Sequence, residues 1–296
     1  MKSIYLIDAS IYIFLGWFSL PVEIVDRQGN PSNAIVGYAR FLTELLERRG
    51  VRRVVAMFDE PLEGLNRKRL YPPYKANREA APEELKRQFN VVRRLSELLG
   101  VPTFSHANHE ADDLIATGAR VAREQGYSVT VVSADKDLAQ LIGPQDRLLD
   151  WARNRSEGPG QIKERLGVYP EQVIDYLALT GDSVDNVPGV PGVGPKSARV
   201  LLKAFNTLDG VYRNLESLEG IGLRSPGRTA KQLKQGKELA ELSKQLVTLK
   251  QDIPQVEERL FSQGEGIDHG QLEAVINEYG FGSYLARRMR LLTGAG

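Results

Sequence analysis

Four short apolar runs, each rich in β-branched residues, punctuate the first half of the chain. They are Ile4–Ile7, Val54–Phe58, Val101–Phe104 and Val129–Val132. Each run is apolar on both faces, which is typical of central strands in a parallel sheet that helices cover on both sides. The pattern therefore predicts four buried strands.

Helical periodicity fills the gaps between these strands. Apolar stripes at helical spacing predict helices over Asn33–Arg49, Pro82–Leu99 and Ala111–Gln125, and a glycine follows each of them. Alternation of strands and helices is typical of an α/β fold. We therefore expect a central, mostly parallel sheet that is flanked by helices.

After about Tyr169 the strand signals stop, and helical runs separated by Gly and Pro take over. The predicted helices are Pro170–Thr180, Pro195–Phe205, Arg228–Thr248 and Gly270–Tyr279. At about 150 residues per domain, the 296 residues suggest two regions. We predict an α/β core over residues 1–168 and a helical region over 169–296. The core contains a segment, 61–90, whose residues 61–82 are polar and Pro-rich, which is typical of a long exposed loop or a mobile helical element.

Acidic residues lie where the predicted strands end. Seven carboxylates follow the four strands or open the next helix: Asp8, Asp59, Glu110, Asp112, Asp113, Asp135 and Asp137. Ligands of an open parallel sheet bind outside the carboxyl ends of its strands, so we expect all seven at one edge. Like charges repel at short range and burial adds to the cost, so a positive counter-charge is needed.

Two more acids, Asp182 and Asp185, follow the predicted helix Pro170–Thr180 and bring the number to nine. The chain has no Cys and only three His, which excludes disulfides, thiolate zinc sites, iron–sulfur clusters and Cys nucleophiles. Oxygen ligands favour Mg²⁺ or Mn²⁺, and nine carboxylates are more than one hydrated Mg²⁺ can use. Two such ions are the usual device for cleaving phosphodiesters.

Other classes of protein also place acids at strand ends. Each Asp taken alone could be a turn former or a helix cap. A response-regulator receiver domain is much shorter and expects an acidic pair after its first strand, where this chain has Ala9 and Ser10 after Asp8. A haloacid-dehalogenase-like phosphatase would have Asp in place of Ser10. The full set of acids therefore favours a metal site over these alternatives.

A Gly- and Pro-rich hairpin, residues 187–194, follows Asp185 directly and precedes the helix that starts at Pro195. Its glycines allow the backbone to approach a ligand, and the amides of the first helical turn suit a phosphate oxygen. This is a helix–hairpin–helix pattern over residues 172–205, which grips a DNA backbone without reading its sequence. The candidate DNA-binding residues here are Gly189, Gly192, Gly194, Lys196, Ser197 and Arg199.

The segment 64–87 is basic, with seven Lys and Arg against three Glu. Its candidate DNA-binding residues are Arg67, Lys68, Arg69 and Tyr74, together with Lys75 and Arg78. Its tyrosines offer faces on which bases could stack. The net charge of the whole chain is only +1, so it is this local distribution that indicates a polyanionic partner. A solvated charged loop is the alternative interpretation.

These residues together resemble the 5′-nuclease (flap endonuclease-like) family, which includes the N-terminal 5′–3′ exonuclease domain of bacterial DNA polymerase I and stand-alone phage and bacterial nucleases. The motifs that carry the resemblance are LIDAS, MFDE, YKANR, HEADDL, VVSADKDLAQLI and GDSVDNVPGVPGVGPKSA. They run from about Ile4 to Phe281. No polymerase region follows Gly296 in this sequence, so we expect a free-standing nuclease or an excised domain.

The resemblance implies a role for each motif residue. The first metal would be bound by Asp8, Asp59, Glu110 and Asp112, the second by Asp137, Asp182 and Asp185, with Asp113 and Asp135 near both. Lys75 would contact the scissile phosphate with Arg78 beside it, so both are candidate catalytic residues. Segment 64–90 would form an arch through which a 5′ strand passes. The hairpin Gly189–Gly194 would grip duplex DNA through a K⁺ ion.

The chain departs from the family pattern at three positions. Ala9 stands where Gly is usual, Leu15 where an Arg that contacts DNA is usual, and Asn66 where Phe is usual. None of the three is a predicted metal ligand, but Leu15 bears on how the 5′ end is steered. These departures motivate the alternative of a structure-specific DNA-binding protein with weak or lost catalysis. A shorter PIN-like nuclease that cleaves RNA is a second alternative.

We therefore expect a metal-dependent 5′–3′ exonuclease and 5′-flap endonuclease with two Mg²⁺ or Mn²⁺ ions. The expected partners are DNA with 5′ flaps or 5′ ends and, functionally, a DNA polymerase. Residues 9–22 mimic a signal peptide, but the uncharged run is shorter than a spanning helix and Asp8 lies at its start. We expect a cytoplasmic monomer that does not enter a membrane.

Overall fold

The computed structural model describes residues 2–48, 50–61, 64–262 and 266–294. Two parts of the predictions lie outside these ranges: Arg49, the last residue of one predicted helix, and residues 62–63 of the segment 61–90. The chain forms two compact units that alternate along the sequence. Unit 1 comprises Met1–Pro61, Ala80–Ala134 and Lys250–Gly296, and unit 2 comprises Leu62–Glu79 and Asp135–Leu249.

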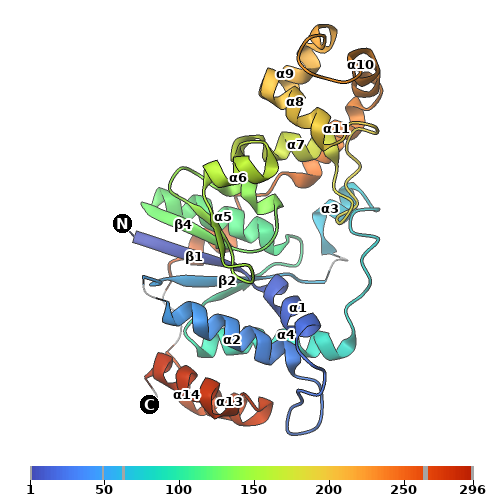
Figure 1. Ribbon diagram of the computed structural model, residues 1–296. Coiled ribbons are helices and arrows are strands. Elements are labelled where there is room, and N and C mark those ends of the chain that lie inside the picture. The colour runs from blue at the N-terminus through green and yellow to red at the C-terminus, as the bar shows by residue number, and fades with distance from the viewer. Residues whose placement is uncertain (1, 49, 62–63, 263–265, 295–296) are drawn as a thin grey trace. The chain divides into compact units, whose positions relative to one another are not determined.

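Unit 1 is built on four parallel strands in the order β3-β2-β1-β4 (Figure 1). Their bounds are Lys2–Asp8 for β1, Val54–Phe58 for β2, Thr103–Ser105 for β3 and Tyr127–Val132 for β4. The prediction of four buried parallel strands is therefore confirmed, and β2 has the predicted bounds. Strand β3 starts two residues later than predicted, since Pro102 has no amide to donate to the ladder.

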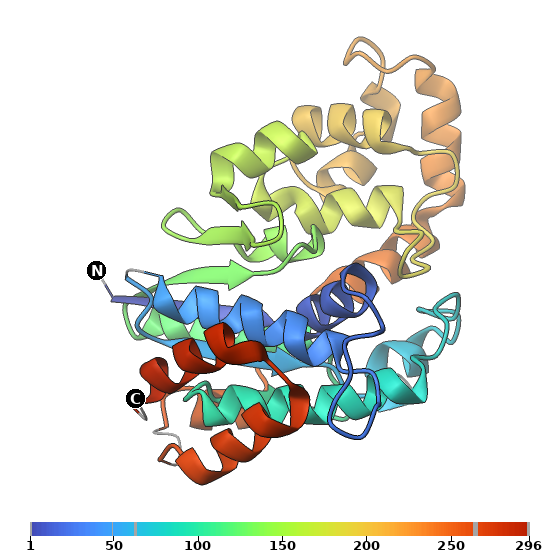
Figure 2. The ribbon, with the colours of Figure 1, turned by 60° about the horizontal axis from the view of Figure 1, so that its bottom comes forward.

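Helices cover both faces of this sheet (Figures 1 and 2). Helices α1 and α2 pack together on one face with α4 beside them, and α5 packs on the other. Helices α13 and α14 form a further layer on α4 and α2. The helices of unit 1 are α1 (Ala9–Ser19), α2 (Asn33–Glu47), α4 (Glu83–Leu98), α5 (Ala111–Glu124), α12 (Pro254–Arg259), α13 (His269–Tyr279) and α14 (Gly282–Thr293).

Helices α1 and α2 cross at a pair of glycines. A Cβ atom on Gly37 would lie 2.6 Å from the Cα of Gly16, so the two backbones touch directly. The uncharged run that mimics a signal peptide is therefore largely helix α1, which buries Tyr12 and Ile13 in the core. None of the helices in the described ranges combines the length and the apolar character that a membrane-spanning helix needs.

Unit 2 is helical apart from one antiparallel hairpin, in which β5 (Arg147–Asp150) pairs with β6 (Arg155–Glu157). Helix α7 packs against α8 and α11 (Figure 1). The helices are α3 (Asn66–Leu70), α6 (Pro159–Leu166), α7 (Val173–Thr180), α8 (Pro195–Phe205), α9 (Leu208–Arg213), α10 (Pro226–Gln235) and α11 (Lys237–Val247), with 3₁₀ turns at Asp137–Leu141, Pro170–Gln172 and Leu215–Ser217.

One predicted helix of this region is two. The predicted helix Arg228–Thr248 is divided at Gly236 into α10 and α11. A Cβ atom at Gly236 would lie 2.8 Å from a methyl carbon of Val190, so the break lets the hairpin pack closely against the two helices. The prediction of one continuous helix was therefore wrong, because a packing contact outweighed local periodicity.

Candidate functional site: two groups of carboxylates

The first carboxylate group lies in unit 1 and consists of Asp8, Asp59, Glu110, Asp112 and Asp113. Asp8 is the last residue of β1 and is 6% exposed. Its Oδ1 accepts a hydrogen bond from the amide of Ile11 at 3.4 Å, which caps α1, and its Oδ2 accepts one from the Ser133 hydroxyl at 2.9 Å. Asp8 therefore has a capping role, the alternative that the sequence left open for any single Asp.

The other members of this group surround the start of α5. Asp59 Oδ1 accepts a hydrogen bond from the amide of Ala111 at 2.9 Å, and the amide of Glu110 donates to Asp113 Oδ2 at 3.3 Å. Glu110 and Asp113 are buried, and Asp112 is partly exposed. Asp113 Oδ1 accepts a further hydrogen bond from the amide of Lys250 at 2.8 Å. The positive end of the α5 dipole favours these negative charges.

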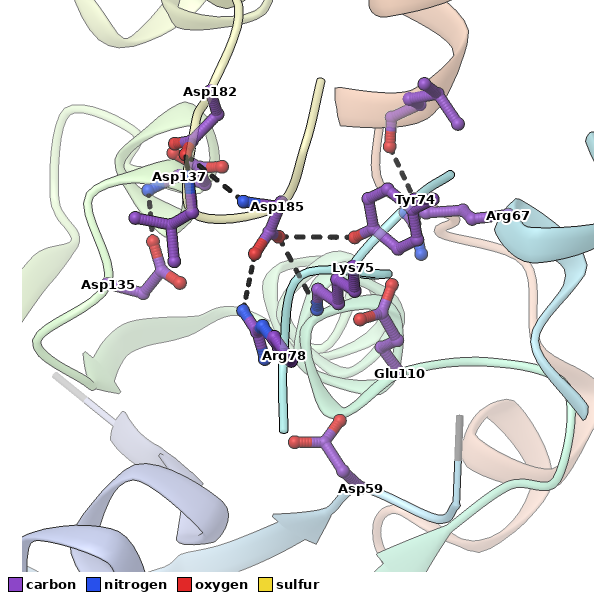
Figure 3. Close-up of polar contacts among 12 residues, drawn as sticks. Asp59, Arg67, Tyr74, Lys75, Arg78, Glu110, Asp135, Asp137, Asp182 and Asp185 are labelled. Carbon is purple, nitrogen blue, oxygen red and sulfur yellow. Dashed lines mark hydrogen bonds and ion pairs between the residues drawn. The ribbon is translucent and has the colours of Figure 1, made fainter. Parts of the chain in front are cut away.

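The second carboxylate group lies in unit 2 and consists of Asp135, Asp137, Asp182 and Asp185 (Figure 3). Asp135 Oδ1 accepts a hydrogen bond from the amide of Asp137 at 2.8 Å, at the start of the 3₁₀ turn Asp137–Leu141. Asp182 Oδ1 accepts one from the amide of Val184 at 2.7 Å. Local turns therefore hold two of the four carboxylates in fixed orientations.

Two carboxyl groups of the second group, those of Asp135 and Asp137, have raised pKa values. Burial, and then the neighbouring charge of Asp135, raises the pKa of Asp137 to about 8. Burial also raises the pKa of Asp135, and the charge of Asp185 adds to that effect. Asp137 Oδ1 is buried and receives no hydrogen bond from any residue that the structure describes. A buried carboxylate oxygen without a donor is costly, so this position fits a positively charged ligand.

Three basic side chains neutralise the rest of the second group. Burial alone would raise the pKa of Asp182, but Lys136, which donates to Asp182 Oδ2, and the amides of Val184 and Asp185 together lower it. Arg78 binds Asp185 Oδ1, and Lys75 Nζ lies 3.4 Å from Asp185 Oδ2 (Figure 3). Sequence reasoning misses the role of Lys136, although its place between Asp135 and Asp137 is a visible signal.

The raised pKa of Asp137 makes a prediction about stability. An unfolded Asp loses its proton near pH 3.8, whereas folded Asp137 keeps it to about pH 8. The folded state thus binds more protons in this window, and its contribution to stability falls as pH rises through it. Asp137→Asn should therefore raise the Tm of the metal-free protein by several degrees at about pH 9 and much less at about pH 4. Thermal unfolding in EDTA measures this, and equal pH dependence of the Tm in both proteins would contradict it.

The fit of these residues to a divalent cation can be judged from their chemistry. Among the described residues, no three His, Asp or Glu side chains already converge closely enough to hold an ion. All donors in both groups are carboxylate oxygens, which suit Mg²⁺ or Mn²⁺, and Asp137 Oδ1 is a buried acceptor without a partner. The chemistry of the donor set therefore fits a hard cation.

Two of the hairpin glycines are needed for close packing. Gly189 has φ +62°, and a Cβ there would lie 2.3 Å from the amide nitrogen of Gly181; its own amide donates to the Ser243 hydroxyl at 2.9 Å. A Cβ on Gly192 would meet the side chain of Gln232. Packing therefore explains glycine at positions 189 and 192, and approach of a ligand to the backbone of these glycines stays a prediction. Only Gly194, of the three, has open space at its Cβ position.

Several predicted DNA-binding residues have internal partners. Arg67 donates to the carbonyls of Leu246 at 2.7 Å and Thr248 at 3.2 Å, at the end of α11, and Arg199 donates to the carbonyl of Leu166 at 2.7 Å. Tyr74 is 4% exposed, so its ring offers no open face for stacking here, contrary to the expectation. Arg69 and Lys196 are exposed, while Lys68 and Ser197 are partly exposed.

Comparison with known proteins relates the whole chain to nucleases. Residues 3–167 match the family model for the N-terminal resolvase-like domain of 5′-3′ exonucleases, and residues 168–263 match the model for their C-terminal SAM fold. A 5′-3′ exonuclease of Buchnera aphidicola subsp. Schizaphis graminum is 35% identical over 86% of this chain and 88% of its own length. DNA polymerase I of Rhizobium leguminosarum is 38% identical over 85% of this chain but only 25% of its own length.

Solved structures share the fold. The D15 protein of phage T5 is 18% identical, with a TM-score of 0.66 and coverage of 99% of both chains. The catalytic core of Rad2 is 17% identical, with a TM-score of 0.63 and coverage of 98% of this chain and 91% of its own. The family models span more than half of the chain, and the described strands and helices form the α/β and helical parts that the sequence predicted. The protein therefore belongs to the 5′-3′ exonuclease family of hydrolases.

Proposed function

We propose that this protein is a divalent-metal-dependent 5′–3′ exonuclease and 5′-flap endonuclease that hydrolyses DNA phosphodiesters by a two-metal mechanism. The observation that carries this proposal is the second carboxylate group, in which a buried oxygen without a donor lies among three further acids. The phage T5 D15 protein was co-crystallised with metal ions, and the Rad2 core was crystallised in complex with DNA substrate. Those structures support metal and DNA as ligands of this chain too.

In this proposal, the carboxylates of each group would be metal ligands, five in unit 1 and four in unit 2. A bound divalent cation supplies Lewis acidity at a phosphate oxygen and a lowered pKa of water. Lys75 and Arg78 would bind the scissile phosphate and orient it, since both are cations fixed next to an acid of the second group. No side chain needs to form a covalent bond with the substrate.

The proposal assigns a part to each region. Residues 1–168 would be the nuclease core, with segment 61–90 as the arch, and residues 169–296 would hold duplex DNA through the helix–hairpin–helix at 172–205. Gly194, Lys196 and Ser197 would contact the DNA backbone, with a K⁺ ion at the hairpin. The similarity to DNA polymerase I supports functional coupling to a polymerase. A cytoplasmic monomer completes the proposal.

A flap substrate tests the proposed function directly. A DNA duplex with a labelled 5′ flap should be cleaved with Mg²⁺ or Mn²⁺ and remain intact in EDTA, and the product strand should carry a 5′-phosphate. The same flap made of RNA should be cleaved more slowly. Binding of the flap without cleavage under all metal conditions would instead favour a DNA-binding protein, which the unusual Leu15 and Ala9 first suggested. Preference for RNA would favour a PIN-like nuclease.

A further inference from the structure

Two turns of unit 2 are tied together by a reciprocal pair of asparagines. The basic turn, residues 71–79, carries Asn77, whose side-chain nitrogen Nδ2 donates a hydrogen bond to the carbonyl of Ser183 at 2.9 Å. The acidic turn, residues 182–186, carries Asn186, whose side-chain nitrogen Nδ2 donates one to the carbonyl of Pro73 at 2.7 Å. Each turn thus supplies one side-chain donor and one backbone acceptor to the other.

Lys75 lies in the basic turn between Pro73 and Asn77, two residues that bind the acidic turn, and its conformation needs support. Lys75 has φ +52°, a region that residues with a Cβ seldom adopt, and it is 7% exposed. Its amide donates to the carbonyl of Asp185 at 3.0 Å, and its Nζ lies 3.4 Å from Asp185 Oδ2 and 5.2 Å from the centre of the Tyr74 ring. Strained backbone persists only where surrounding contacts over-determine it.

We propose that Asn77 and Asn186 form an amide clamp that positions Lys75, and that both are therefore positioning residues for the reaction. This inference rests on the proposed function, in which Lys75 binds the scissile phosphate. Neither asparagine amide is bonded to an acid of the second group; each binds the backbone of the opposite turn. An Asp at either position would keep the size but lose the N–H donor.

The chemistry at each position explains why asparagine serves there. Asn186 has φ +56°, which Asn tolerates better than most residues, and its side chain donates a hydrogen bond to the carbonyl of Pro73. Asn77 is exposed, so its hydrogen bond to Ser183 is formed in competition with water and does not fill the core. The clamp therefore fixes geometry rather than supplying bulk to the fold.

The test compares Asn77→Ala, Asn186→Gly and the double variant with wild type. Glycine at 186 removes the donor but still accepts the positive φ. The matched control is Asn154→Gly, because Asn154 also has a positive φ (+46°) in an exposed turn of the same unit, between β5 and β6. Flap cleavage gives kcat and KM, and hydrogen exchange reports protection of the Lys75 amide.

The clamp predicts that each single variant loses about five- to tenfold in kcat with little change in KM, as expected when one oriented hydrogen bond is lost. The double variant should lose little more than the worse single variant, since either loss frees Lys75. Exchange of the Lys75 amide should accelerate in all three variants and not in Asn154→Gly.

Unchanged exchange at Lys75 would overturn the clamp, as would a fall in kcat of the same size in Asn154→Gly. A rise in KM with kcat unchanged would overturn the positioning role, since it would indicate lost binding only. If wild-type protein fails to cleave any flap, the proposed function and the positioning role fail together. The exchange data then still decide whether the two asparagines hold the turns.

Discussion

Asp182→Asn is expected to abolish flap cleavage but to leave DNA binding measurable. Asn keeps a side-chain oxygen that can accept the hydrogen bond from the Val184 amide, so the acidic turn should keep its shape. What is lost is a negative charge in the second carboxylate group, and with it a proposed metal ligand, whose loss would cost several kcal/mol of transition-state stabilisation. We expect kcat to fall by about 10³-fold or more.

Single-turnover cleavage and fluorescence anisotropy with the same flap measure the two properties separately. The matched control is Asp146→Asn, because Asp146 is also buried in unit 2 and accepts a turn amide, that of Gly143 at 3.0 Å, but belongs to neither carboxylate group. The control should cleave at a rate close to that of wild type. Full turnover by Asp182→Asn would refute its assignment as a metal ligand.

Lys75→Met is expected to have the second largest effect. Methionine keeps much of the length of this buried side chain, so the change removes mainly the charge. Arg78 still binds Asp185 Oδ1, which limits the cost to folding. If Lys75 binds the scissile phosphate, its charge is felt most in the transition state, and kcat should fall by about 10²–10³-fold with a much smaller change in KM.

Steady-state kinetics on the flap substrate measure this effect. Lys244→Met is the matched control, since Lys244 Nζ lies 2.9 Å from the buried Asp175 in the same unit, and neither residue belongs to a carboxylate group. Both variants lose a lysine from an ion pair with an Asp, so this loss is common to them. Only Lys75→Met should cleave the flap slowly. Equal activities in the two variants would exclude a phosphate contact by Lys75.

The strands of unit 1 could be predicted because their physics is local. Val54–Phe58 is apolar on both faces, and no other element explains such a run so well. Helix α1 was harder, since its apolar residues show almost no helical stripe and two of its positions, Phe14 and Phe18, stay exposed. The short strands β5 and β6 were missed because three or four residues carry too little periodic signal.

The sequence predicts which residue types form the candidate site, but not which side chains form hydrogen bonds and ion pairs with one another. Acids at strand ends are visible in any single sequence, and all nine were named. The partners of Asp185, in contrast, lie more than 100 residues earlier in the chain, at Tyr74 and Arg78. No local rule indicates that the basic turn binds this acid, or that Arg67 caps the end of α11. Such pairings arise only from tertiary packing.

Binding of divalent cations by the carboxylate groups can be measured by anomalous diffraction from crystals soaked in Mn²⁺. We expect strong anomalous peaks within direct coordination distance of carboxylate oxygens, one of them at Asp137 and its neighbours in the second group, and we expect that peak to be lost in Asp137→Asn. Crystals that take up no Mn²⁺ at any of the nine carboxylates would show that these side chains are not metal ligands.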